Sequence, residues 1–110
     1  MNLLSLSDGI YNGKYNAGRW TNEMNITIKG HKIIKLYVAK DVSIPKPEVT
    51  NAMLSKVIKK QNTNVDVISG AIVTSKAYLK AIENALNKLT QLIHFKIIAF
   101  LNRRGYNLFN

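Results

Sequence analysis

The sequence has no cysteine, only two histidines and only six acidic residues among its 110 residues. Without cysteine, the chain can form no disulfide and can hold no metal through thiolates. His31 and His94 stand apart from any cluster of acidic residues, so we predict no metal site. No stretch approaches the roughly 18 consecutive apolar residues of a membrane span. The first seven residues lack the basic and apolar regions of an export signal, so we expect neither signal nor anchor, and the compartment stays unassigned.

Side-chain catalysis also finds little support. The six carboxylates are scattered along the chain, and there is no nucleophile elbow, phosphate-binding loop or dinucleotide-binding glycine motif. Neither histidine stands at a spacing that suggests pairing with a serine. We therefore expect that any reactivity belongs to a bound cofactor.

Positive charge is in large excess, with 16 Lys and Arg against 6 Asp and Glu, a net charge of +10. Such a surface attracts anions of many kinds. The basic residues are spread along the chain and are not interleaved with aromatic residues, as they are in single-strand binders. We interpret the charge as a solvated basic surface and do not expect nucleic-acid binding.

The apolar pattern predicts an α+β fold, with a small antiparallel sheet packed against two helices. A short strand at 10–15, an alternating strand at 20–28 and a return strand at 33–39, joined by the turn Gly30-His31, predict a hairpin or three-stranded meander. A helix is expected from Glu48, or from Thr50 as its N-cap, to about Gln61. Residues 65–68 are predicted as a short strand or extended piece. The second helix is expected from Ser75, with apolar residues at spacings of three and four.

The C-terminal part has a different character. Residues 92–101 are apolar nearly all round, which favours a helix that is buried in the fold or against a second copy in a homodimer. Contact with an anionic membrane, helped by Arg103 and Arg104, is the less favoured alternative. We divide the chain into an N-terminal extension (1–7), one domain (8–89) and an apolar and basic C-terminal segment (90–110).

Most of the polar chemistry lies in one stretch, Asp66–Ser75. It holds three hydroxyls, one carboxylate and one glycine, between an apolar segment and the start of the second helix. A helix N-terminus with a nearby glycine suits a phosphate group. The same residues also fit an ordinary turn followed by a Thr or Ser N-cap, and the residues alone favour that second interpretation.

Three blocks together resemble the FMN-binding domain family, which includes the flavin-carrying domains of sodium-pumping NADH–quinone reductases and related membrane complexes. They are Asp8–Gly13 (DGIYNG), the hairpin Asn25–Ile33 (NITIKGHKI) and Val65–Ser75 (VDVISGAIVTS). The family has D-G-x-Y-x-G near its start, then a hairpin, then D-x-x-S-G-A-T-x-T-S before its last helix. The order and spacing of all three blocks agree with this pattern.

The resemblance implies FMN held at the Ser69–Ser75 junction and used for electron transfer, with a redox partner that the sequence does not identify. In many members a flavin transferase joins the FMN phosphate to the last threonine of the motif, which corresponds to Thr74. Position 72 is Ile where the motif has Thr or Ser, and this departure argues against a covalent link. Members often work outside the cytoplasm or at membranes. The predicted cofactor-binding residues are Asp66, Ser69, Gly70, Ala71, Thr74 and Ser75, and the aromatic candidates for a flavin bed are Tyr11, Tyr15, Trp20 and Tyr78.

The alternative function is a basic binding or assembly module that keeps this fold without a cofactor. Its support is the net charge and the apolar segment 92–101.

Overall fold

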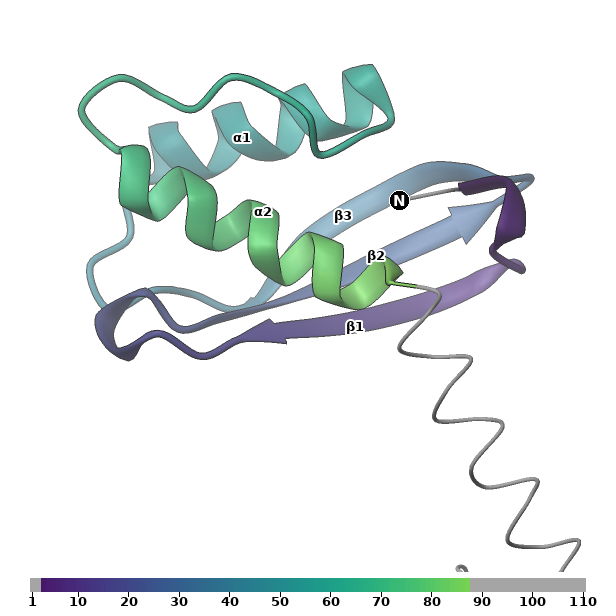
Figure 1. Ribbon diagram of the computed structural model, residues 1–110, viewed down its shortest axis with the longest axis horizontal. Helices are drawn as coiled ribbons and strands as arrows, with labels where there is room; N and C mark the ends of the chain where they lie inside the picture. Colours follow the sequence, from purple (N-terminus) through teal and green to yellow (C-terminus); the bar gives the residue numbers. More distant parts are fainter. Residues whose placement is uncertain (1–2, 88–110) are drawn as a thin grey trace, which may run out of the picture.

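The computed structural model describes residues 3–87 and confirms the α+β class. Three antiparallel strands lie in the order β1-β2-β3, and the two helices lie on one side of this sheet (Figure 1). The predicted homodimer contact at 92–101 lies outside the described residues. The elements are two short 3₁₀ turns, η1 (Leu3–Ser5) and η2 (Gly18–Trp20), strands β1 (Gly9–Tyr15), β2 (Asn22–Lys29) and β3 (Lys32–Lys40), and helices α1 (Pro47–Lys60) and α2 (Ile72–Leu86).

The sheet forms where apolar and polar residues alternate in the sequence. In β2, Met24, Ile26 and Ile28 are almost fully buried, while the residues between them lie on the opposite face and are half-buried. At the β2–β3 turn, Gly30 and His31 both have positive φ, 57° and 62°. Two such residues form the turn whose twist matches a hairpin. The predicted meander and its turn are therefore confirmed.

Helix α2 lies across β1 and β2, and its apolar stripe forms much of the core. Tyr78, Ala81, Ile82 and Ala85 are completely buried. The helix comes unusually close to β1 at Gly13: a Cβ atom there would overlap the Ala81 carbonyl and the Ala85 backbone nitrogen. The close packing of α2 on β1 therefore requires a glycine at position 13.

Helix α1 packs beside β3 and begins earlier than predicted. It starts at Pro47, with Lys46 as an N-cap that makes no side-chain hydrogen bond. A start at Glu48, or at Thr50 as N-cap, is therefore wrong, because proline suits the first helical turn, where its missing N–H has no partner to lose. The predicted end is confirmed: Gln61, in the left-handed conformation with φ 58°, follows the last helical residue.

The start of one predicted strand needs correction. The second strand begins at Asn22, because the chain turns through η2 at Gly18–Trp20 before it enters the sheet. Of the two alternatives for residues 65–68, only the strand is contradicted, because these residues run without strand pairing and the described sheet has only three strands. The junction before α2 is therefore a loop-to-helix junction.

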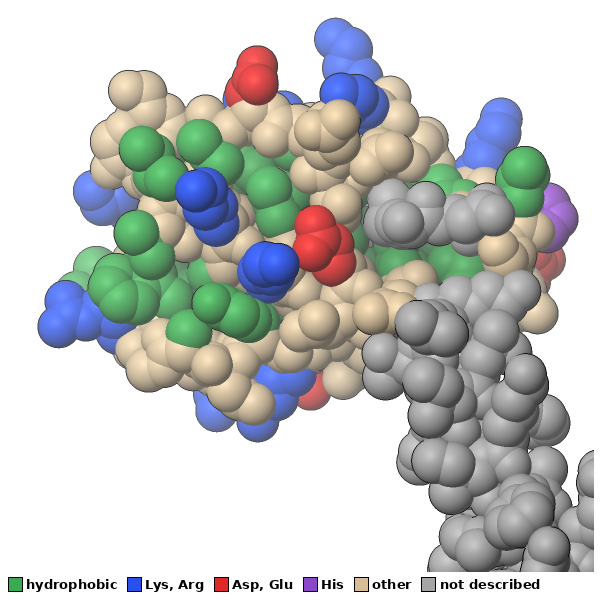
Figure 2. Space-filling view, viewed as in Figure 1, with side chains coloured by type: hydrophobic (Ala, Val, Ile, Leu, Met, Phe, Trp, Pro, Cys, Tyr) green, Lys and Arg blue, Asp and Glu red, His purple; other side chains and the backbone are tan. Residues whose placement is uncertain are grey.

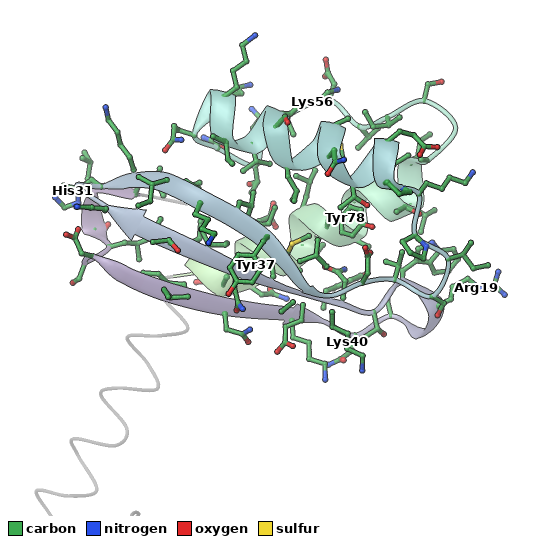
Figure 3. The ribbon with its side chains drawn as sticks, turned by 180° about the vertical axis from the view of Figure 1, so that it is seen from behind. Arg19, His31, Tyr37, Lys40, Lys56 and Tyr78 are labelled. Atoms are coloured by element: carbon green, nitrogen blue, oxygen red, sulfur yellow. The ribbon has the colours of Figure 1, made fainter. Side chains whose placement is uncertain are left out.

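A buried hydrogen-bond network joins α2 to α1 and to the end of β3. The Tyr78 hydroxyl donates to Asp41 Oδ1 at 2.6 Å and lies 2.9 Å from Thr50 Oγ1. Figure 3 shows Tyr78 between α1 and the sheet. Burial, and next the hydrogen bond to Asp41, raise the pKa of Tyr78 to about 12 from an ordinary value near 10. Tyr78 therefore stays neutral across the physiological pH range.

We predict that Gly13→Ala lowers the free energy of unfolding by about 1–3 kcal/mol, because the new methyl group must push α2 away from β1. Urea denaturation measures this change. The matched control is Lys14→Ala, an exposed neighbour in the same strand, which should stay within about 0.5 kcal/mol of wild type. Equal stabilities for the two variants would contradict the close packing at Gly13.

We predict that Tyr78→Phe destabilises the domain at pH 7 by about 1–3 kcal/mol, because Asp41 and Thr50 lose their buried partner. The folded-state pKa of Tyr78 lies above the unfolded value, so its stabilisation is complete below pH 10 and is lost as the pH rises toward 12. The difference in unfolding free energy between wild type and Tyr78→Phe should therefore shrink over that window. A difference that stays constant from pH 9 to pH 12 would contradict the raised pKa.

Candidate functional site

The motif segment folds into a tight turn before α2. The Ala71 N–H donates to the Ile68 carbonyl at 3.0 Å, which closes a four-residue turn. Gly70, the third residue, has φ 81°, a conformation that this type of turn requires and that glycine adopts without strain. No atom lies within 4 Å of where a Gly70 Cβ would stand, so the surface beside it is open to a ligand.

Ser75 holds this turn against the helix. It is completely buried, and its hydroxyl accepts a hydrogen bond from the Ile68 N–H at 3.2 Å and donates to the Ala71 carbonyl at 2.7 Å. The Ser75 N–H also donates to the Ala71 carbonyl, at 2.9 Å. Because its proton is already used, Ser75 positions the turn and cannot donate to a ligand in this arrangement.

Helix α2 begins at Ile72, three residues earlier than predicted. Its N-cap is Ala71, which makes no side-chain hydrogen bond, so a Thr or Ser N-cap is wrong. The first N–H groups of a helix have no intrahelical acceptor, and here no N-cap side chain covers them. They carry the positive end of the helix dipole. This helix start can therefore donate several hydrogen bonds to an anion.

Two hydroxyls stand beside this helix start. Ser69 is exposed in the turn, and Thr74 is half-buried in the first turn of α2. Among the described residues, no hydrogen bond is found for either hydroxyl. Backbone N–H groups and free hydroxyls are the donors that bind phosphate, so this donor set fits the phosphate of FMN.

Asp66 lies apart from these residues. It is exposed, and its backbone carbonyl accepts a hydrogen bond from Lys56 Nζ at 3.0 Å. The turn therefore brings together five of the six predicted site residues, and Asp66 lies at the edge of a neighbouring groove.

An apolar surface flanks the helix start. Ile72 and Val73 are 51% and 53% exposed. In Figure 2, hydrophobic side chains gather at the left end of the molecule, around the start of α2. Ile72 does not contribute a hydroxyl to the site, but it adds apolar surface next to the proposed phosphate position.

The four aromatic candidates lie in different places. Tyr78 is completely buried and its hydroxyl is bonded, so no flavin can stack on it. The Tyr11 hydroxyl donates to the Ser7 carbonyl. Tyr11 lies opposite Ile26 in the sheet and is four residues away from Tyr15 along β1. Tyr15 and Trp20 are half-buried at the end of the sheet that is nearer the start of α2.

A cavity of about 440 Å³ lies between β3 and the first half of α1, and the sequence did not predict it. Its polar lining residues are Asp41, Thr50 and Asn51, and its apolar lining includes Leu36, Val38 and Leu54. Asp41 and Thr50 are the two partners of Tyr78. Thr74 and Tyr78 are four residues apart, so they lie on one face of α2 about 6 Å apart along its axis. Neither residue is among those that line the cavity, and no pattern in the sequence indicated it.

The comparisons with known proteins bear on the family to which the chain belongs. Within residues 3–87, no helix is long and apolar enough to cross a membrane. A search among curated proteins gives no match. A family model described as the FMN-binding domain matches residues 11–87, which is most of the chain. The chain therefore belongs to the FMN-binding domain family, whose cofactor is FMN.

Proposed function

We propose that this protein is an electron-transfer module whose FMN phosphate is held by the 68–71 turn and the start of α2. The observation that carries this proposal is the uncapped start of α2, beside two hydroxyls with no partner among the described residues. FMN accepts and releases electrons when bound, and that is the chemistry it supplies here. The protein binds the phosphate, orients the ring and covers part of it from water.

Thr74 is the central phosphate ligand in this proposal. Its hydroxyl lies in the first turn of α2, where the helix dipole also favours an anion. We infer a reversible hydrogen bond from Thr74 to the phosphate, because Ile72 replaces the hydroxyl that the family motif has at that position. Ser75 acts indirectly, by fixing the turn that presents the backbone N–H groups.

We further infer that the isoalloxazine ring occupies the cavity between β3 and α1. Its volume of about 440 Å³ is in the range of small-molecule sites. The cavity is mainly apolar, as a flat ring requires, and the exposed Asn51 offers a polar group for the edge of a ring. The Tyr78 network fixes Asp41 and Thr50, so these walls are rigid before a ligand enters.

The test of the phosphate site is Thr74→Val. We expect FMN to bind wild type with a flavin absorbance spectrum, and Thr74→Val to bind about 10- to 100-fold more weakly, the effect of one lost charge-assisted hydrogen bond. Titration with FMN, followed by protein or flavin fluorescence, measures the affinity. Thr27→Val, on the other face of the sheet, is the matched control. A wild-type protein that takes up no FMN would refute the proposed function.

Acid precipitation tests the inferred reversible attachment. We expect all flavin to appear in the supernatant for wild type, and Ile72→Thr co-expressed with a flavin transferase to retain flavin in the precipitate. Retention should disappear in the double variant Ile72→Thr/Thr74→Val. Flavin that stays with precipitated wild-type protein would instead establish a covalent link and reject the reversible one.

The ring position has its own test, Asn51→Trp. Asn51 is exposed on α1 and lines the cavity, so a tryptophan there can fill the cavity without disturbing the core. We expect FMN affinity to fall at least about tenfold, in line with the filling of a specific ligand pocket. Asn51→Ala, which leaves the cavity open, should bind within a few-fold of wild type. Wild-type affinity in Asn51→Trp would place the ring elsewhere.

A further inference from the structure

A groove lined by lysines lies between the second half of α1 and the loop that follows it. Its volume is about 510 Å³, and its lining residues are Lys56, Lys59, Lys60, Asn64, Val65 and Asp66. In Figure 2, basic side chains stand out from the upper edge of the molecule, over the end of α1. Figure 3 shows Lys56 on the side of α1 that faces away from the sheet.

Two of the three ammonium groups are fixed by the loop. Lys56 Nζ donates to the Asp66 carbonyl at 3.0 Å, and Lys60 Nζ donates to the Asn64 carbonyl at 2.5 Å. An ammonium has three protons, so each retains donors for a second partner. Fixed positions also mean that less side-chain entropy is lost when an anion binds.

The loop itself is held in place at several points. The Asn64 N–H donates to Asn62 Oδ1 at 2.9 Å, and Thr63 Oγ1 donates to Glu83 Oε1 in α2 at 3.2 Å. At its start, the Gln61 side chain pairs with the Ile33 backbone through two hydrogen bonds, at 2.7 and 3.0 Å. One wall of the groove is therefore a loop that hydrogen bonds hold in place.

Its positive charge is poorly compensated. Three lysines face one carboxylate, Asp66, and among the described residues the single ion pair within 4 Å joins Lys80 to Glu83 elsewhere. On the sheet, by contrast, Glu23 lies between Lys14 and Lys40 in the strand register. The carbonyl end of the α1 dipole offsets only part of the charge of Lys59 and Lys60.

The groove also adjoins the flavin segment. Asp66, which lines it, is the first residue of the motif stretch, and the bond from Lys56 fixes the backbone there. The groove therefore shares Asp66 with the motif stretch, while the 68–71 turn follows further along the chain.

We propose that this groove docks a protein partner through protruding Asp or Glu side chains. Charge complementarity selects an anion, and a groove of about 510 Å³ between helix and loop has room for several carboxylate side chains of one acidic segment. Docking by these contacts does not depend on FMN. That the docked partner exchanges electrons with the flavin rests on the proposed function.

An octaglutamate peptide is the probe, titrated into the ¹⁵N-labelled full chain at low salt. We expect amide shifts concentrated at residues 56–66, and an affinity that weakens steeply as salt shortens the screening length from about 30 Å at 0.01 M to about 10 Å at 0.1 M. The triple variant Lys56→Gln/Lys59→Gln/Lys60→Gln should bind about tenfold more weakly or worse, as expected for three lost charge contacts of modest strength.

The control removes the same number of charges from the sheet, with Lys29→Gln/Lys32→Gln/Lys40→Gln, and should bind within about twofold of wild type. Equal losses in the two triple variants, or shifts spread over the whole surface, would overturn the proposal in favour of attraction to net charge alone. Vesicles of phosphatidylserine and phosphatidylcholine, or duplex DNA, that shift the same amides at lower concentration would also overturn it. Peptide binding by a protein that takes up no FMN would refute only the proposed function.

Discussion

The structure depends above all on the close approach of α2 to β1 at Gly13. Because this residue has no side chain, the helix backbone at Ala81 and Ala85 can lie directly on the strand. Two side-chain amides reinforce the contact: Asn84 Nδ2 donates to the Lys14 carbonyl at 2.8 Å, and Asn22 Nδ2 donates to the Ala77 carbonyl at 3.0 Å. With its middle and end held in this way, α2 has one position on the sheet, and the position of its first turn follows.

That first turn is the proposed phosphate site, so in this proposal packing and function are coupled through one helix. On one face of α2, the Tyr78 hydroxyl bonds to Asp41 and Thr50 and thereby holds α2 against α1. The same helix uses Ser75 to hold the preceding turn. Structural hydrogen bonds thus involve Ser75 and Tyr78, while Ser69 and Thr74 remain available. This division between positioning residues and binding residues could not be obtained from the motif alone, in which all the hydroxyls look equivalent.

The sheet and the helical stripes were predictable because their signals are local: alternation in 22–28 and spacings of three and four in α2. The wrong predictions concern segments whose structure is decided by tertiary contacts. Helix α2 starts at Ile72 because the buried Ser75 hydroxyl bonds to the turn and is not an N-cap. Residues 65–68, predicted as a strand or an extended piece, form no strand: Val65, Val67 and Ile68 pack against the core outside the three-stranded sheet. The sequence made Tyr78 a candidate for the flavin bed because its burial and its hydrogen bonds to Asp41 and Thr50 depend on the fold.

The function of the candidate site also could not be predicted from residue types alone. Residue types alone favoured a turn with a Ser or Thr cap, and the resemblance to a family was needed to suggest FMN. The structure contradicts the cap of that interpretation and contains its turn, since α2 begins without any side-chain cap. The lysine groove follows a similar logic. In the sequence its basic residues are part of a scattered excess, and only the fold of loop 61–66 back along α1 places their ammonium groups around one recess.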